Sequence, residues 1–445
     1  MNSAEKNNKT ENAADLVSRK IALDMLREIL DRKNALDVVL ERSQEFADLP
    51  QRDRAFTRML ITTTLRRLGQ IDDLITFAQD RPNTLKTPAL HHILRLGVTQ
   101  MFFMNVPDHA SVDTCVRLTE DSGFSKQKGF VNAVLRRLSR EGHDRIAKQD
   151  ASRLNTPDWL LKIWINDYGL QTAGQIALAN MSEAALDITV KDKAERAFFG
   201  NALTASELST GTLRRLQGGN IRDLEGFEDG KWWVQDAAAA LPATLFGDAK
   251  DKKIIDMCAA PGGKTLQLAA MGAHVTAIDR SSKRLKKLKE NLVRLDLEEH
   301  VHIETADGAS WSSKEPVKYI LLDAPCSATG TMRRHPDTGY LKSETDITGL
   351  QTIQERLLNH SANILSIGGM IIYCTCSLQK AEGEEQIDQF LKMHPNFERN
   401  PITPEEVGQY DELINDKGDL RILPFMLSAA GGIDGFFVSR LVKIG

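Results

Sequence analysis

From residue 252 onward the sequence alternates short apolar stretches with helical patterns, and no other feature constrains the fold so strongly. The apolar stretches lie at 254–255, 275–278, 320–322 and 370–373. Such an alternation predicts βαβ units, in which a parallel sheet carries helices on both faces. In an open sheet of this kind, ligands bind at the carboxyl ends of the strands. We therefore expect a Rossmann-like α/β domain over residues 231–445.

The first third of the chain shows a different pattern, in which apolar residues recur three and four positions apart. Val17, Ile21 and Met25 share one helix face, and residues 90–98 repeat this spacing. Helix breaks are expected at three prolines, Pro50, Pro82 and Pro107. This pattern predicts an all-α domain over residues 15–140.

Three segments flank the all-α domain. Residues 1–14 are polar and have no apolar core, so we expect a disordered tail. Residues 141–155 are mostly polar and are expected to form a linker. Alternation at 186–190 and the apolar run at 232–234 predict strands. We therefore expect a small α/β subdomain, preceded by a linker helix, over residues 156–230.

Composition excludes two classes of protein. No stretch reaches about 18 consecutive apolar residues, so no membrane-spanning helix is expected. Five cysteines in 445 residues are an odd set, unlike the disulfide framework of a small secreted domain, and we expect a cytoplasmic protein. The net charge of −4 does not indicate an RNA binder, although affinity for a phosphate backbone depends on local Lys/Arg clusters.

A loop of small residues follows the first strand of the α/β domain, in the segment DMCAAPGGKT at 256–265. Small residues allow the backbone to approach a ligand, and the free N–H groups at the start of the next helix point toward it. A phosphate-binding loop would need glycine in place of Cys258, and the loop also lacks the Gly-x-Gly-x-x-Gly spacing of a dinucleotide site. An NTPase is therefore the runner-up interpretation.

Two carboxylates follow the next two strands. Asp279 suits the hydroxyls of a ribose and Asp307 suits the amino group of an adenine, although a helix cap would explain either residue alone. With the loop, they fit a ligand that has a diol and an adenine but no phosphate, and S-adenosylmethionine is such a ligand. The cofactor site is expected to comprise Cys258, Ala259, Ala260, Pro261, Gly262, Gly263, Lys264, Asp279, Asp307 and Asp323.

Two cysteines lie in loops after neighbouring strands, Cys326 in DAPCSATG and Cys376 in YCTCS. The carboxyl ends of parallel strands meet at one sheet edge, so both thiols are expected in one crevice beside Asp323. A single cysteine in such a place is more often a small buried apolar residue, and Cys374 is expected to be one. No histidine or fourth thiol stands at a suitable spacing for zinc, so no metal is expected.

The segments DMCAAPGGKT, LLDAPCSATGTMRRHPD, YCTCS and DGFF together resemble the RNA 5-methylcytosine methyltransferases. The segment GFVNAVLRRL at 129–138 resembles the NusB-type RNA-binding domain. The pairing is similar to the bacterial small-subunit ribosomal RNA methyltransferases of the Sun/Fmu type and covers nearly the whole chain. It implies a multidomain protein with an all-α NusB-like domain, a small α+β, RRM-like segment and an α/β class I methyltransferase domain.

The resemblance also implies a reaction and the residues that perform it. A methyl group would pass from S-adenosylmethionine to carbon 5 of a cytosine in small-subunit (16S) ribosomal RNA. Cys376 would be the covalent nucleophile, Cys326 would assist product release, and Asp323 would contact the base close to the methyl donor. DNA 5-methylcytosine enzymes use the cysteine of the Pro-Cys loop, so Cys326 is the alternative nucleophile. A transfer RNA substrate and a non-catalytic RNA-binding or antitermination factor are the alternative functions.

RNA contacts are expected just after the Pro-Cys loop, where Arg333, Arg334 and His335 would hold a phosphate or a flanking base. A surface salt-bridge cluster is the competing interpretation of this trio. Two further basic clusters, at 126–140 and 280–289, are either RNA contacts or solvated helix faces. The family's Arg-x-Asn before the catalytic domain is replaced by ITVK at 188–191, which weakens the case for RNA contacts there. We expect a monomer.

Overall fold

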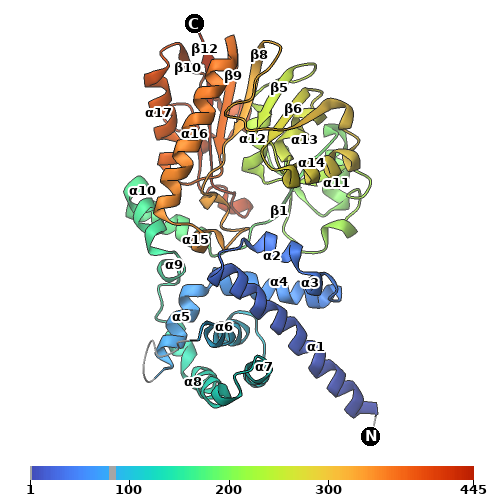
Figure 1. Cartoon of the computed structure of the whole chain (residues 1–445), viewed down its shortest axis with the longest axis vertical. Helices are drawn as coiled ribbons and strands as arrows, with labels where there is room; N and C mark the ends of the chain where they lie inside the picture. The colour runs from blue at the N-terminus through green and yellow to red at the C-terminus, as the bar shows by residue number, and fades with distance from the viewer. Residues whose placement is uncertain (1–2, 80–86) are drawn as a thin grey trace. The chain divides into compact units, whose positions relative to one another are not determined.

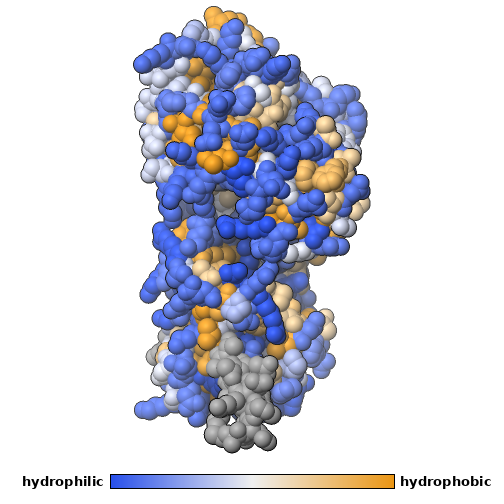
Figure 2. Space-filling model, turned by 90° about the vertical axis from the view of Figure 1, so that its right-hand side faces the viewer, coloured by the Kyte–Doolittle hydropathy of each residue, from blue (hydrophilic) through white to orange (hydrophobic). Residues whose placement is uncertain are grey.

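The computed structural model describes residues 3–79 and 87–445, and its contacts divide the chain into two compact units (Figure 1). The helical unit comprises Met1–Met181 and Arg334–Ser343, and the α/β unit comprises Ser182–Arg333 and Glu344–Gly445. Figure 2 shows a surface that is mostly hydrophilic, with hydrophobic side chains in separate patches. Among the described residues, no helix is long and apolar enough to cross a membrane.

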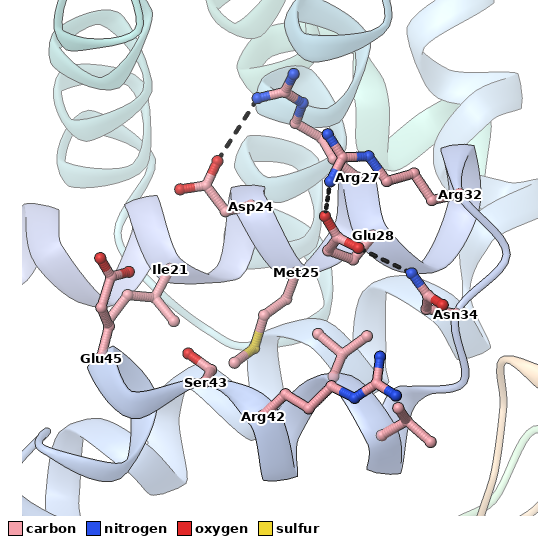
Figure 3. Close-up of a pocket in the computed structure, with 12 residues that line it drawn as sticks. Ile21, Asp24, Met25, Arg27, Glu28, Arg32, Asn34, Arg42, Ser43 and Glu45 are labelled. Atoms are coloured by element: carbon pink, nitrogen blue, oxygen red, sulfur yellow. Dashed lines mark hydrogen bonds and ion pairs between the residues drawn. The ribbon is translucent and has the colours of Figure 1, made fainter.

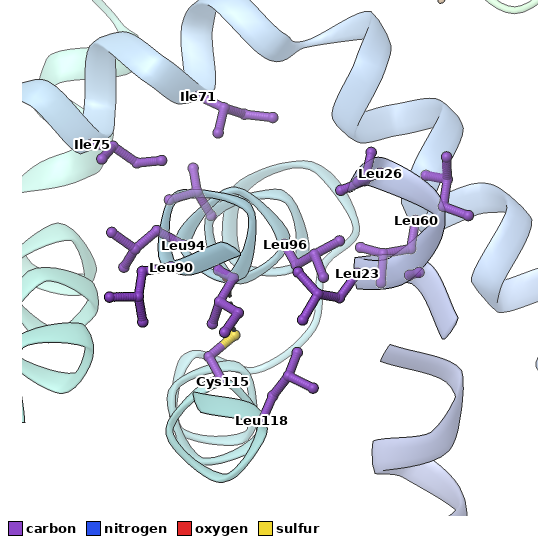
Figure 4. Packing of buried hydrophobic residues seen from close by; sticks show 14 of the residues in the cluster. Leu23, Leu26, Leu60, Ile71, Ile75, Leu90, Leu94, Leu96, Cys115 and Leu118 are labelled. Atoms are coloured by element: carbon purple, nitrogen blue, oxygen red, sulfur yellow. Dashed lines mark hydrogen bonds between the residues drawn. The ribbon is translucent and has the colours of Figure 1, made fainter. Parts of the chain in front are cut away.

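The helical unit is built around α6 (Pro88–Phe103), which is apolar around most of its circumference and therefore lies at the centre of the bundle (Figure 4). The expected helix breaks at Pro50 and Pro107 are confirmed, because a helix begins directly after each of them. The break expected at Pro82 lies outside the described residues. The other helices are α1 (Ser3–Leu26), α2 (Leu36–Arg42), α3 (Gln44–Ala47), α4 (Gln51–Arg66), α5 (Leu68–Phe77), α7 (Asp108–Asp121), α8 (Lys128–Ile146), α9 (Ala151–Leu154) and α10 (Asp158–Ala179).

Two expectations for the flanks of this bundle are corrected. Helix α1 begins at Ser3 and replaces most of the expected tail over 1–14, which contains the strong helix formers Ala, Glu and Lys. The expected linker over 141–155 is largely helical, since α8 continues to Ile146 and α9 follows. The Asn155 side chain accepts a hydrogen bond from the backbone N–H of Gln70, 85 residues away (3.0 Å). Polar composition alone does not reveal such distant partners.

A short piece of the expected methyltransferase domain belongs to the helical unit instead. Residues Arg334–Ser343, which include α15 (Thr338–Leu341), pack with the N-terminal helices. The carboxylate of Asp337 accepts a hydrogen bond from Leu36 N–H (2.8 Å), and Trp159 Nε1 donates to the carbonyl of Gly339 (3.2 Å). This result corrects the continuous boundary that we expected for residues 231–445.

The α/β unit begins with a small antiparallel sheet in the order β2-β3-β1-β4. Its strands are β1 (Leu186–Val190), β2 (Ser206–Glu207), β3 (Leu213–Arg215) and β4 (Trp232–Val234). Helix α11 (Arg196–Ala202) contributes Phe199 to the core that covers this sheet. The strands expected at 186–190 and 232–234 are therefore confirmed.

The larger, eight-stranded sheet has the order β10-β12-β9-β8-β5-β6-β7, with β11 paired to β12. Strands β9, β8, β5, β6 and β7 are parallel, and β12 runs antiparallel to β9. The expected parallel sheet is thus confirmed, with an antiparallel edge added. The strands are β5 (Lys253–Met257), β6 (His274–Asp279), β7 (Val301–Thr305), β8 (Val317–Asp323), β9 (Leu365–Thr375), β10 (Phe397–Arg399), β11 (Leu420–Ile422) and β12 (Phe436–Lys443).

Helices cover both faces of the larger sheet (Figure 1). One face buries the apolar sides of α12 (Ala237–Thr244), α13 (Gly263–Ala270) and α14 (Ser282–Leu295). The other face buries α16 (Glu344–Ile364) and α17 (Glu384–Met393). The loops that carry the predicted functional residues lie at the carboxyl ends of the parallel strands.

Candidate active site

The loops after β5, β6, β8 and β9 meet at one edge of the larger sheet because these strands are parallel and adjacent. The loop after β5 carries the small residues of the predicted cofactor site. The loops after β8 and β9 carry the two predicted catalytic cysteines. The structure thus brings together elements that are up to about 120 residues apart in the sequence.

The backbone of the expected cofactor loop has a positive φ at two positions, Cys258 (64°) and Gly262. Gly262 precedes α13 with a φ of 112°, and a Cβ there would lie 2.3 Å from Leu288 Cδ1. Two hydrogen bonds anchor the loop to β6, from Ala259 N–H to the carbonyl of Ile278 (2.9 Å) and from Ala260 N–H to Asp279 Oδ2 (3.2 Å). The loop therefore presents the start of α13 in a fixed conformation.

We predict that Gly262→Ala weakens binding of S-adenosylmethionine by about 10-fold or more, because the added methyl group forces the loop away from Leu288 and strains the backbone. Titration calorimetry with the cofactor measures this loss. Gly247→Ala is the matched control, since its φ is also positive (66°) but no atom lies within 4 Å of an added Cβ. Equal cofactor affinities for the two variants would contradict the prediction.

The two carboxylates expected to bind the cofactor already have local partners. The buried Asp279 carboxylate accepts hydrogen bonds from Ala260 N–H and Ser281 N–H (2.8 Å), and it lies 3.3 Å from the Arg284 guanidinium. Asp307 accepts a hydrogen bond from Ala309 N–H (3.0 Å) in the turn after β7. Each carboxylate thus supports a turn, as a capping role requires, and the contacts to ribose and adenine remain predictions.

Lys264 and Asp323 form an ion pair between the start of α13 and the end of β8, with Lys264 Nζ 2.7 Å from Asp323 Oδ2. Burial by itself lowers the pKa of Lys264, but the neighbouring Asp323 carboxylate outweighs it, so the pKa lies above its usual range and the ammonium stays charged. The ammonium also lies 5.0 Å from the centre of the Phe436 ring. The sequence indicated Lys264 and Asp323 separately but did not show that they pair.

The two cysteines of interest are in direct contact, with Cys326 Sγ 3.4 Å from Cys376 Sγ. Both side chains are partly exposed at the sheet edge. The contact with Cys376, together with burial, raises the pKa of the Cys326 thiol well above its usual value. Cys326 is therefore a protonated thiol at neutral pH and lies in contact with the sulfur of Cys376, where either thiol can be the donor.

The other cysteines near this edge are poor nucleophiles. Burial and the Asp279 carboxylate raise the pKa of Cys258 to about 12. Burial and the Asp323 carboxylate also raise the pKa of Cys374, whose side chain is fully buried in the core as expected. A protonated, buried thiol reacts slowly. Cys374 is thus closed to a ligand at the sheet edge, and the role of Cys376 as nucleophile remains a prediction.

The structure separates the basic trio that was expected to contact RNA. Arg333 is buried in the α/β unit, where its guanidinium donates to the carbonyls of Gly431 (2.5 Å) and Glu183 (3.4 Å). Arg334 and His335 belong to the helical unit, and His335 Nδ1 lies 3.3 Å from Asp37 Oδ2. The trio is therefore not one exposed patch, and RNA contact by its members remains a prediction.

A pocket in the helical unit offers a different kind of surface (Figure 3). Its volume is about 350 Å³, and residues of α1, α2, the segment between them and the start of α3 line it. Two pairs of oppositely charged residues lie in its wall, Asp24 with Arg27 (3.6 Å) and Glu28 with Arg32. Its lining contains no cysteine or histidine. In the described part of the chain, no group of three or more His, Cys, Asp or Glu side chains is arranged to hold a metal ion.

Comparisons with known proteins agree with this architecture. A family model described as 16S rRNA methyltransferase RsmB/F matches residues 243–442, and a NusB family model matches residues 16–140. The crystal structure of PH0851 shares the fold, with a TM-score of 0.76 at 21% identity over 97% of this chain and 99% of that one. The class of the protein is thus a methyltransferase that carries a NusB-type domain.

Two relatives show which family within this class the chain belongs to. The chain is 33% identical to ribosomal RNA small subunit methyltransferase B of Pseudomonas putida, over 96% of this chain and 98% of that protein. It is 35% identical to the protein of the same name from Serratia proteamaculans, over 84% of this chain and 90% of that protein. The chain therefore belongs to the RsmB/F family of 16S rRNA methyltransferases.

Proposed function

We propose that this protein transfers a methyl group from S-adenosylmethionine to carbon 5 of a cytosine in small-subunit ribosomal RNA, through a covalent bond between Cys376 and the base. The observation that carries the proposal is the contact of Cys376 with the protonated Cys326, 3.4 Å apart. This pair lies at the same sheet edge as the Lys264–Asp323 ion pair and the small-residue loop.

The residues around the loop fit S-adenosylmethionine. Asp256, at the end of β5, has a buried carboxylate oxygen that no group in the described part of the chain satisfies. Unsatisfied buried acceptors are rare, and a ligand with ammonium, hydroxyl and amino donors would satisfy this one. The 258–264 loop, Asp279 and Asp307 would hold the cofactor, which supplies an electrophilic methyl group when it is bound.

Cytosine needs activation before its carbon 5 can accept a methyl group. The Cys376 thiolate adds to carbon 6, forming a carbon–sulfur bond and making the ring enamine-like, so that carbon 5 attacks the methyl group. Loss of the carbon 5 proton to a base then restores the double bond and expels the Cys376 thiolate. Each bond that forms to Cys376 is thus broken again within one turnover.

The neighbouring side chains have separate tasks in this scheme. Asp323 would contact the pyrimidine edge, and Lys264 holds the Asp323 carboxylate in place. Cys326 would assist release of the product, because its protonated thiol lies directly beside the sulfur that must leave. General acid–base assistance of this kind typically contributes about 10²- to 10⁴-fold to a rate.

Two other parts of the chain support an RNA substrate. The NusB-type match covers the helical domain. The strand order β4-β1-β3-β2, with a helix between β1 and β2, supports our proposal that the small sheet is an RRM-like unit. An unpaired or extruded base is the form in which RNA would reach Cys376.

Helix α14 carries an exposed cationic face next to the cofactor loop. Lys283 and Lys289 belong to a run of six Lys and Arg residues at 280–289, all exposed to solvent. The first turn of α14 contains no acidic residue, although the helix dipole favours negative charge there. Lys283, in this first turn, is a cation that the dipole disfavours, and contact with phosphate explains it more easily than helix stability does.

We predict that Lys283→Ala/Lys289→Ala weakens RNA binding by about 10-fold at moderate salt and lowers the slope of log affinity against log salt by about 1.5. Filter binding across a salt series measures both quantities. Lys314→Ala/Lys318→Ala is the matched control, since it removes exposed cations near the start of β8, at the opposite sheet edge. Equal affinities for the two double variants would refute the role of α14.

Methyl transfer from labelled S-adenosylmethionine tests the proposed reaction. Purified protein is incubated with small-subunit ribosomal RNA and, separately, with transfer RNA, and the products are digested to nucleosides. The proposal expects the label in 5-methylcytidine from ribosomal RNA. Label in transfer RNA alone would favour the alternative substrate, and no label in 5-methylcytidine would refute the proposed chemistry.

A further inference from the structure

A buried carboxylate that the proposed chemistry does not use lies behind the two cysteines. Glu382 ends a short 3-10 turn (Lys380–Glu382) that follows β9, and its side chain is fully buried. Burying a carboxylate costs free energy of folding unless hydrogen-bond donors satisfy its oxygens. The partners of Glu382 therefore show what the residue does.

Four donors converge on the Glu382 carboxylate. Oε1 accepts hydrogen bonds from the backbone N–H of Ser327 (3.0 Å) and from Gln354 Nε2 (2.9 Å). Oε2 accepts hydrogen bonds from the hydroxyls of Ser327 (2.5 Å) and Ser377 (2.6 Å). Glu382 thus binds two segments of the chain at once.

These two segments are the loops that carry the thiols. Ser327 directly follows Cys326, and Ser377 directly follows Cys376. The two serine hydroxyls also lie 3.1 Å from each other, although the residues are 50 positions apart in the sequence. One carboxylate therefore joins the residues adjacent to both cysteines.

Other contacts hold this junction in place. Gln354 Nε2, from α16, donates to Glu382 and also to the carbonyl of Pro325 (2.9 Å). The hydroxyl of Tyr373, on β9, donates to the backbone carbonyl of Glu382 (2.9 Å). The carboxylate is thereby fixed relative to the strand that leads to Cys376.

We propose that Glu382 is a positioning residue that sets the separation of the Cys326 and Cys376 thiols by clamping Ser327 and Ser377. The inference rests on the proposed function, in which the two thiols act in one turnover. Glu382 itself does not touch the reacting atoms. Gln379 Oε1 also accepts from the hydroxyls of Ser327 (3.1 Å) and Ser377 (2.6 Å), so without the clamp the loops lose one of two shared acceptors. A displacement of about 1 Å at a reacting group can reduce a rate about 10²-fold.

The variant Glu382→Gln tests this inference, because the amide keeps the shape of the side chain but loses one acceptor and adds a donor. We expect kcat for RNA methylation to fall about 10²-fold, while KM for S-adenosylmethionine and for RNA changes less than about three-fold. Asp419→Asn is the matched control, since Asp419 is a buried carboxylate that pairs with Arg399 (3.1 Å) and does not contact either loop. We expect its kcat to equal that of the wild type.

Ser377→Ala provides a milder second test if Glu382→Gln does not fold. We expect this variant to lose about 10-fold in kcat and to show little further loss when it is combined with Glu382→Gln, because both changes break the same contact. A folded Glu382→Gln variant with wild-type kcat would overturn the clamp, and so would a Ser377→Ala variant with wild-type kcat. Failure of the proposed function would look different, because the wild-type protein itself would then form no 5-methylcytidine.

Discussion

Replacing Cys376 by alanine is expected to abolish RNA methylation, with a fall in kcat of at least about 10⁴-fold. Without the thiolate, carbon 5 of the cytosine remains too poor a nucleophile to accept the methyl group. Affinity for S-adenosylmethionine should stay within about two-fold of wild type, because Cys376 lies on the loop after β9 and not in the cofactor loop.

Single-turnover methylation with saturating RNA and cofactor measures this effect on the chemical step. Cys115→Ala is the control for the loss of a thiol, since Cys115 is buried in the helical unit. Methylation by Cys376→Ala at more than about one hundredth of the wild-type rate would contradict the role of Cys376 as nucleophile.

The second large effect is expected for Cys326→Ala, which should form the covalent adduct but release it slowly. Its thiol is protonated and lies 3.4 Å from Cys376 Sγ, so its loss removes the nearest proton donor to the sulfur that must leave. Multiple-turnover kcat should fall about 10²- to 10³-fold. A protein–RNA species that survives denaturation should accumulate with unmodified RNA.

A denaturing gel with labelled RNA detects this species. Cys326→Ala/Cys376→Ala is the control, because without Cys376 no adduct can form. Rapid turnover by Cys326→Ala, or an adduct that persists in the double variant, would show that Cys326 does not act in release from Cys376.

Much of the candidate active site was predictable from the sequence. The alternation of strands and helices fixes a parallel sheet, and parallel strands must end at one edge, so Cys326, Cys376 and Asp323 had to lie near one another. The loop at 258–264 was recognisable because its small residues stand at fixed positions directly after a strand. Local patterns of this kind require no knowledge of distant partners.

Other features depend on contacts between residues far apart in the sequence. The segment Arg334–Ser343 joins the helical unit through bonds such as Leu36 N–H to Asp337, across 301 positions. Arg333 has the charge of an RNA contact, but its buried partners are backbone carbonyls. The role of Glu382 depends on Ser327, which no local pattern connects to it. Periodicity and composition carry no information about such pairs.

Trapping with RNA that contains 5-fluorocytidine tests the central claim most directly, because a base cannot remove fluorine from carbon 5 as it removes the proton, and the covalent adduct therefore persists. The protein is incubated with this RNA and S-adenosylmethionine and digested, and the cross-linked peptide is sequenced by mass spectrometry. The account predicts a nucleotide attached to Cys376, with the adduct lost in Cys376→Ala. An adduct on Cys326 that survives Cys376→Ala and disappears in Cys326→Ala would reverse the assignment of the two thiols.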